Sequence, residues 1–241
     1  VLLSYGPRIR GGNRGVSRGD SGAGGSNRRR PARPQYSVWE RAHGFAVTKK
    51  ELRQHLRSIL EQFSPKELHA RSVLACQHLI DTPEYDQAEI IMIFLSLPTE
   101  VDTTPLALQA WRDHKRVLAP KVSWEQRRML PTEIRSLSDD VSESPMGIRE
   151  PAQGMPIPVG NIDLVIVPGL GFDGLGNRVG RGRGFYDRFL AHRDWKGAAC
   201  GLALHEQVVN QVPTRDHDMK VDLLATDQQV HRFGNRVAVK S

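Results

Sequence analysis

The apolar positions of this chain change between a helical spacing and continuous runs. From Lys49 the apolar residues recur every three or four positions as far as Phe63, which predicts a helix capped by Thr48. The segment Ser64–Glu67 reads as a capping box with a proline in the first turn, and it predicts a second helix to about Asp81. The residues expected on its inward face are Leu68, Leu74, Leu79 and Ile80.

Continuous apolar runs predict buried strands between the helices. The predicted strands are residues 89–96, 116–119, 162–167, 197–204 and 221–226, the last of them closing the sheet. Further helices are expected at 104–114 and 185–190, and the polar, proline-rich segment 136–158 is expected to be a loop. Strands that alternate with helices predict an α/β fold, in which a mostly parallel sheet carries helices on both faces in a single domain.

The first 38 residues have a different composition, rich in glycine, serine and arginine. Such a segment cannot bury a core, so we expect a disordered extension over residues 1–38 and one folded domain over 39–241. Three interpretations of the extension remain open. It is an organelle transit peptide, an RGG-like tail that binds nucleic acid, or an extension without function.

The net charge of +7 comes from that extension. It holds eight of the 34 Lys and Arg residues and one of the 27 Asp and Glu residues, so 26 of each remain in the folded part. A neutral folded part argues against binding to a polyanion.

Two cysteines, Cys76 and Cys200, are too few for a disulfide framework and indicate a reducing compartment. The longest apolar run, residues 90–97, is too short to span a membrane.

The segment from Val167 to Asp187 carries the most informative chemistry. It follows a predicted strand, and Arg178, Arg181 and Arg183 alternate with its last glycines. Glycine lets backbone N–H groups turn toward an anion, and the planar arginine head fits phosphate oxygens. A carboxylate just after the loop could hold Mg²⁺ against those phosphates. The pattern predicts a loop that binds nucleotide phosphates at the carboxyl end of a strand. Its glycines are Gly169, Gly171, Gly174, Gly176, Gly180, Gly182 and Gly184.

Two other interpretations fit parts of this segment. Glycine-rich loops often form only tight turns. Residues 169–174 also match the dinucleotide fingerprint G-x-G-x-x-G, but that fingerprint opens a helix directly, whereas here the helical residues begin only at Phe185. The chain has no G-x-x-x-x-G-K-[ST] motif, which excludes a P-loop of the common kind.

The segment resembles the C-terminal signature of 5-formyltetrahydrofolate cyclo-ligases, P-G-x-x-F-D-x-x-G-x-R-x-G-x-G-x-G-[FY]-Y-D-R, read from Pro168 to Arg188. Other segments agree with the family in type and order. Residues 49–53 resemble its K-x-x-L-R motif, residues 94–103 its F-L-S…E-[IV]-[DE]-T motif, and residues 218–222 its D-x-x-x-D motif. Residues 147–151 resemble a G-I-x-E-P motif. The resemblance covers roughly residues 47–226.

The resemblance implies an ATP- and Mg²⁺-dependent enzyme that converts 5-formyltetrahydrofolate into 5,10-methenyltetrahydrofolate and releases ADP and phosphate. The γ-phosphate would activate the formyl oxygen, and the folate N10 would then close the ring. It implies ATP contacts at Lys49, Arg53, Arg178, Gly180, Arg181, Gly182, Arg183, Gly184, Phe185 and Tyr186. The implied folate contacts are Leu95, Glu100, Arg181, Gly182, Arg183, Gly184 and Phe185. The resemblance also implies catalytic roles for Arg181, Arg183 and Tyr186. The implied Mg²⁺ ligands are Asp187 and Asp218.

Simpler interpretations exist for several of these residues. Lys49 and Arg53 could form a solvated helix face, and Asp187 could be an acid favoured by a helix dipole. Asp218 and Glu100 could be acids of a surface turn and a strand end. The four tryptophans are not interleaved with basic residues and give no sign of a stacking platform.

The alternative function is a nucleic-acid-binding protein that uses the RGG-like tail and the Arg/Gly loop. A third possibility keeps the family fold without its activity. As an enzyme of this family, the chain is expected to bind a reduced folate and ATP, to be a monomer, and to need neither a membrane nor a nucleic acid. We expect it in the cytoplasm, or in mitochondria if residues 1–38 are a transit peptide.

Overall fold

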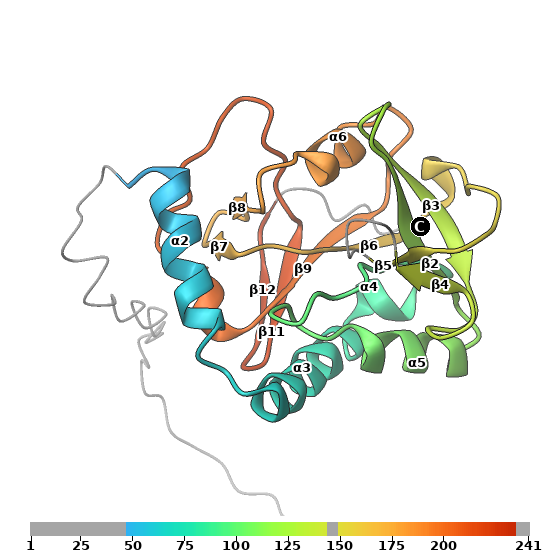
Figure 1. The fold of residues 1–241 in the computed structure, drawn as a ribbon, viewed down its shortest axis with the longest axis horizontal. Coiled ribbons are helices and arrows are strands. Elements are labelled where there is room, and N and C mark those ends of the chain that lie inside the picture. The colour runs from blue at the N-terminus through green and yellow to red at the C-terminus, as the bar shows by residue number, and fades with distance from the viewer. Residues whose placement is uncertain (1–46, 144–148, 235–241) are drawn as a thin grey trace, which may run out of the picture. The chain divides into compact units, whose positions relative to one another are not determined.

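A seven-stranded sheet forms the centre of the computed structural model, which describes residues 47–143 and 149–234 (Figure 1). The strand order is β12-β11-β9-β6-β1-β2-β3. The five inner strands run parallel, and β3 and β12 pair antiparallel at the two edges. The predicted mostly parallel sheet is therefore confirmed. The strands are β1 Ile90–Met92, β2 Arg116–Ser123, β3 Arg128–Ile134, β6 Leu164–Val167, β9 Ala198–Ala203, β11 Leu223–Thr226 and β12 Val230–Arg232.

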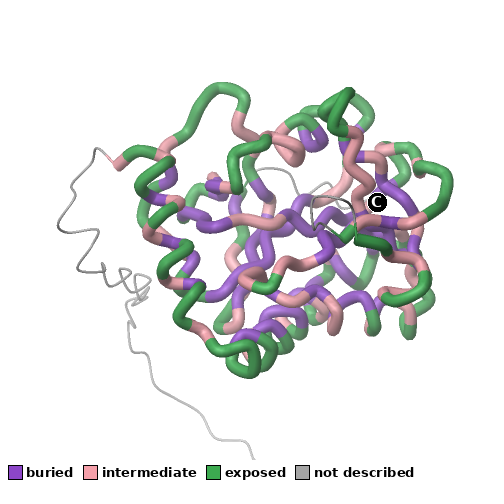
Figure 2. Tube along the Cα trace, in the orientation of Figure 1, coloured by how far each residue is buried: buried purple, intermediate pink, exposed green. Residues whose placement is uncertain are grey.

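Helices cover both faces of the sheet, as predicted. In Figure 1, α3 and α5 run along one side and α6 lies on the other. Successive strand residues point to opposite faces. Ile91 and Val117 therefore join the core under α2, α3 and α5, whereas Met92 and Leu118 join the core under α6. Figure 2 shows the strands buried between these layers. The helices are α2 Lys49–Leu60, α3 Pro65–Ile80, α4 Pro83–Asp86, α5 Thr104–Arg112 and α6 Phe185–Leu190.

The predicted helix starts are confirmed. Thr48 and Glu51 form a capping box at α2, and Ser64 accepts the Glu67 N–H at α3. The inward position predicted for Leu74 is wrong, because 51% of this residue is exposed. On a helix of 3.6 residues per turn, Leu74 lies opposite the face that α3 buries.

Several short strands escaped the sequence pattern. β2 continues beyond residue 119 and pairs with β3, and Pro120 faces Pro131 in this hairpin. Prolines argue against a strand, which is why the hairpin was not expected. The predicted loop 136–158 contains β4 Val141–Glu143 and β5 Arg149–Pro151. β12 follows the strand that was expected to close the sheet.

The first half of the glycine-rich segment belongs to the scaffold. β7 Gly171–Asp173, β8 Arg178–Val179 and β10 Val208–Val209 form a small sheet of their own. A Cβ on Gly169 would lie 2.6 Å from the Phe172 ring, so that glycine is needed for packing. The buried Asp173 accepts the N–H groups of Leu175, Asn177 and Val212, and so closes its own turn.

Parts of the chain lie outside the described residues. They include the extension 1–38, the boundary between residues 38 and 39, and the first two residues of the G-I-x-E-P motif. The remaining short elements are the 3-10 turns η1 Val159–Asn161 and η2 His205–Gln207. In residues 47–143 and 149–234, no helix is long and apolar enough to cross a membrane.

Candidate active site

Two cations in the first turns of α2, Lys49 and Arg53, contact residues from the second half of the chain. Lys49 Nζ is paired with Asp218 Oδ2, and both side chains are mostly buried. Arg53 Nε donates to Gly180 O at 2.8 Å. Burial opposes ionisation of Asp218, but the hydrogen bonds from Lys49 and from the Arg215 N–H lower its pKa. Arg53 thus faces the glycine loop, and Lys49 faces Asp218.

The glycine loop proper is residues 180–184. Gly182 has φ +97° and Gly184 has φ +66°, a left-handed conformation that side chains rarely adopt. A Cβ on Gly182 would touch the guanidinium of Arg53 at 3.5 Å. Gly184 is the N-cap of α6. The loop can follow this path only because these positions are glycine.

Arg178 is a buried cation at the start of this loop, with 6% of its side chain exposed. Its Nη2 donates to Asp187 Oδ1 at 2.9 Å, and the same oxygen accepts the Met219 N–H at 3.2 Å. Burial lowers the pKa of Arg178, although Asp187 opposes that shift. Met219 adjoins Asp218, so both predicted metal ligands meet beside Arg178.

Two buried polar atoms of this cluster have no hydrogen-bond partner, Arg178 Nε and the Tyr186 hydroxyl. The Arg178 guanidinium lies 5.7 Å from the centre of the Tyr186 ring. Burial also raises the pKa of Tyr186, so its hydroxyl stays protonated at neutral pH. An unpartnered buried polar group costs about 1–3 kcal/mol, and most such groups in native proteins have a partner. These two donors therefore mark a place where a ligand could bind.

Arg181 joins the glycine loop to the segment after β1. Its Nε donates to Glu100 Oε1 at 2.8 Å, while Glu100 Oε2 accepts the Leu97 N–H at 3.1 Å. Leu95 and Glu100 both line an open cavity of about 450 Å³ between α3, this segment and the β4–β5 hairpin. The two predicted folate contacts from outside the loop thus share one cavity.

Arg183 and Phe185 contact a residue that the sequence did not indicate. The Arg183 guanidinium lies 5.4 Å from the centre of the Trp124 ring, and the Phe185 ring meets Trp124 edge-on at 5.4 Å. Trp124 follows β2 at the tip of the β2–β3 hairpin. Because the hairpin was not predicted, no local pattern could place this tryptophan at the loop.

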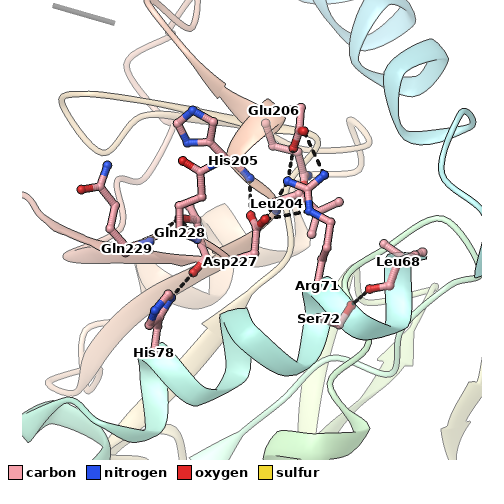
Figure 3. A network of polar contacts seen from close by, with 12 residues as sticks. Leu68, Arg71, Ser72, His78, Leu204, His205, Glu206, Asp227, Gln228 and Gln229 are labelled. Carbon is pink, nitrogen blue, oxygen red and sulfur yellow. Dashed lines mark hydrogen bonds and ion pairs between the residues drawn. The ribbon is translucent and has the colours of Figure 1, made fainter. Parts of the chain in front are cut away.

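A second charged cluster lies at the carboxyl ends of β9 and β11 (Figure 3). Arg71 of α3 donates to Asp227 at 2.7 Å and to both Glu206 oxygens at 2.8 and 2.5 Å. Asp227 also accepts the His205 N–H at 2.7 Å. The hydrogen bond to Glu206 is the main cause of a raised Arg71 pKa. All three guanidinium nitrogens contact a carboxylate, so we call this cluster the Arg71 clamp and assign it to the scaffold.

Comparison with known proteins identifies the family. The model of the 5-formyltetrahydrofolate cyclo-ligase family matches residues 46–227. The chain belongs to this family. It is 34% identical to the mouse 5-formyltetrahydrofolate cyclo-ligase over 185 residues, which cover 72% of this chain and 91% of the mouse protein. It is 26% identical to an Arabidopsis thaliana mitochondrial 5-formyltetrahydrofolate cyclo-ligase, covering 76% and 75% of the two chains.

A solved structure supports the same assignment. The NMR structure of Aquifex aeolicus 5,10-methenyltetrahydrofolate synthetase is 28% identical and superposes with a TM-score of 0.69, covering 81% of this chain and 97% of that one. The prediction of an enzyme of the cyclo-ligase family with an α/β fold is therefore confirmed. The role of each site residue stays a prediction.

The structure brings most of the predicted residues together in two adjoining places. Lys49, Arg53, Arg178, Asp187 and Asp218 surround the start of the glycine loop. Leu95 and Glu100 line the cavity, to which Arg181 is joined through Glu100. Arg183 and Phe185 contact the hairpin tip instead.

The two carboxylates of the candidate site, Asp187 and Asp218, fit a weakly held Mg²⁺. Asp187 uses Oδ1 and Asp218 uses Oδ2 for the hydrogen bonds to the protein, which leaves the second oxygen of each carboxylate for other ligands. Among the residues that the structure describes, no group of three or more His, Cys, Asp or Glu side chains could hold a metal ion. Mg²⁺ commonly takes one or two carboxylates and completes its shell with phosphates and water.

Proposed function

We propose that this chain converts 5-formyltetrahydrofolate into 5,10-methenyltetrahydrofolate with ATP and Mg²⁺. One observation carries the proposal. Lys49, Arg53 and Arg178 gather at the start of the glycine loop, and Arg178 Nε and the Tyr186 hydroxyl, which flank this loop in sequence, are buried without a partner. A cationic cluster with unused donors suits the phosphates of ATP.

In this proposal the phosphates of ATP lie along residues 180–184. Lys49, Arg53 and Arg178 supply positive charge, and the glycines at 180, 182 and 184 let the backbone approach the phosphate oxygens. Asp187 and Asp218 hold Mg²⁺ beside them. The ion would neutralise phosphate charge during transfer. Without the ion, Arg178 is paired with Asp187 and Lys49 is paired with Asp218.

The reduced folate occupies the cavity beside the loop. Leu95 offers an apolar wall, and Glu100 offers a carboxylate that can accept hydrogen bonds from the pterin ring. Arg181 connects Glu100 to the glycine loop at 2.8 Å, so the folate site and the phosphate site share one side chain. Such a shared residue would align the formyl group with the γ-phosphate.

The chemistry then has two steps. The formyl oxygen attacks the γ-phosphorus, the bond to the ADP oxygen breaks, and the oxygen becomes a good leaving group. N10 then attacks the formyl carbon and gives up its proton to the departing phosphate, the carbon–oxygen bond breaks, and the five-membered ring closes. Arg181 and Arg183 stabilise negative charge on the transferred group, and the protonated Tyr186 hydroxyl donates to one of its oxygens. No covalent enzyme intermediate is needed.

The test is to mix purified protein with ATP, Mg²⁺ and 5-formyltetrahydrofolate and to follow the near-ultraviolet absorbance of the methenyl product. We expect a rise that needs all three components, with one ADP released per product. Controls each omit one component. A folded protein that gives no rise would contradict the proposal, and RNA binding by residues 1–38 would then be the next property to measure.

We also propose that the enzyme acts as a monomer on these small molecules alone, in the cytoplasm or in mitochondria. The compartment can be read by fusing residues 1–38 to a fluorescent protein. Mitochondrial import of the fusion would identify these residues as a transit peptide. A diffuse cytoplasmic signal would contradict that role. Sedimentation of the purified chain gives the oligomeric state.

A further inference from the structure

The tip of the β2–β3 hairpin, residues 124–127, meets the second half of the glycine loop although the two are about sixty residues apart in sequence. In Figure 1 the hairpin rises beside α6, and α6 packs against β3. The hairpin tip does not belong to the residues that the family motifs indicate. Trp124 and Arg127 of this tip nevertheless contact the glycine loop and the first turn of α6.

Arg188 fastens these two segments to each other. Its Nε donates to the carbonyl of Arg127 at 2.8 Å, and its Nη2 donates to the carbonyl of Arg183 at 3.0 Å. Its guanidinium also lies 5.2 Å from the centre of the Phe185 ring. Arg127 has φ +50°, a conformation that is uncommon for a residue with a side chain. A single planar head group thus fixes a strained turn against the glycine loop.

Trp124 at this tip is 36% exposed, and the Arg183 guanidinium lies over its ring. An exposed cation–π contact is weak, and Arg183 has a long, mobile side chain that can leave the ring at little cost. A flat aromatic ring buries more surface on an indole than a guanidinium does. Both proposed substrates carry such rings, adenine in ATP and the pterin and benzoyl rings in folate.

We propose that Arg188 is a positioning residue and Trp124 a wall of the substrate site. Arg188 holds the hairpin tip against the glycine loop, so that a substrate ring stacks on Trp124 in place of the Arg183 guanidinium. Arg183 is thereby released toward the reacting phosphate. This inference rests on the proposed function. It adds two residues, Trp124 and Arg188, to which the family resemblance assigns no ligand contact.

The experiment compares steady-state kinetics of the full chain and five variants: Trp124→Ala, Trp124→Phe, Arg188→Ala, the double variant Trp124→Ala/Arg188→Ala, and Arg193→Ala. Arg193 is the matched control, because its side chain is 91% exposed just after α6. We expect Trp124→Ala to raise KM for one substrate about ten-fold with kcat within two-fold, as for loss of one stacked ring. Trp124→Phe restores most of that affinity. Arg188→Ala reproduces the KM change, and the double variant adds little to it.

The KM values for the two substrates show which of them supplies the ring that stacks on Trp124. A higher KM for ATP alone assigns the Trp124 face to adenine, and a higher KM for 5-formyltetrahydrofolate alone assigns it to a folate ring. Unchanged KM values for both, or equal increases in both with a lower melting temperature, would overturn the inference. An inactive wild-type protein would instead remove the proposed function, so the two failures are distinguishable.

Discussion

Two mostly buried arginines, Arg71 and Arg178, differ in how many of their guanidinium nitrogens have a hydrogen-bond partner. Arg71 has all three nitrogens in contact with Glu206 or Asp227, and the hydrogen bond to Glu206 is the main cause of its raised pKa. Among the described residues Arg178 has one carboxylate partner, Asp187, and burial lowers its pKa. Its Nε is buried without a hydrogen bond.

The difference separates scaffold from site. The Arg71 clamp ties α3 to the ends of β9 and β11, and its hydrogen bonds are complete without a ligand (Figure 3). Around Arg178 the fold leaves donors unused, which costs stability unless a ligand pairs them. Unpaired donors inside a cationic cluster are therefore better evidence for a binding site than positive charge alone.

The largest effect is expected from Arg181→Ala. Arg181 joins Glu100 to the glycine loop, and removing a charged donor aimed at a transferring group commonly costs about a hundred-fold in turnover. The melting temperature should stay near that of the wild type, because the side chain is 38% exposed. Arg193→Ala is the control with normal turnover. Wild-type turnover in Arg181→Ala would remove this residue from the site.

The next effect concerns stability instead of activity. Arg71→Met removes the charged hydrogen bonds of the clamp, and partial exposure reduces their worth, so we expect the free energy of unfolding to fall by about 1–2 kcal/mol. Urea denaturation measures this. Lys66→Met, an exposed change on the same helix, should leave stability unchanged. A loss of turnover above two-fold in folded Arg71→Met would contradict the scaffold role.

Two tyrosines give a matched comparison. Tyr186→Phe removes an unpartnered hydroxyl, so turnover should fall about ten-fold while stability stays equal or rises by up to about 1 kcal/mol. Tyr85→Phe removes a hydroxyl that donates to Asp113 at 2.6 Å, so stability should fall by about 1 kcal/mol with normal turnover. The reverse pattern would show that the Tyr186 hydroxyl is only structural.

The smallest effect is a pH dependence of the clamp. Burial opposes ionisation of Glu206, yet the hydrogen bond from Arg71 lowers its pKa below the ordinary value of 4.5. A carboxylate with a lowered folded-state pKa stabilises the fold above its unfolded pKa, and that contribution is lost as the pH falls through the folded value. The stability difference between wild type and Arg71→Met should therefore shrink below about pH 4.5. A difference that stays constant down to pH 3 would contradict the assignment.

Local patterns predicted α2, α3, α5, α6 and the buried strands, because periodicity and caps are read within a few residues; the four-residue α4 was not predicted. They missed the β2–β3 hairpin, in which Pro120 faces Pro131. β1 pairs with β2 only as far as Leu118, and beyond that residue β2 pairs with β3. In the site, the glycine loop and its arginines were visible. The pairing of Lys49 with Asp218, 169 residues apart, required either the family motifs or the fold.

Residue type alone does not separate neighbouring acids by role. Asp173 and Asp187 both lie in the signature segment. The Asp173 carboxylate, however, already accepts hydrogen bonds from its own turn and from Val212. Asp187 lies beside Arg178 and keeps one oxygen for other ligands. Which hydrogen bonds are already satisfied is a property of the folded chain, and residue type does not reveal it.

The most direct test is the rise in melting temperature that Mg-ATP produces in the wild type, in Arg71→Met and in Arg53→Ala. A ligand that binds only the folded state raises stability according to its occupancy. We predict equal rises for the wild type and Arg71→Met, and little or no rise for Arg53→Ala. A rise kept by Arg53→Ala and lost by Arg71→Met would contradict the account, because the nucleotide would then bind at the Arg71 clamp.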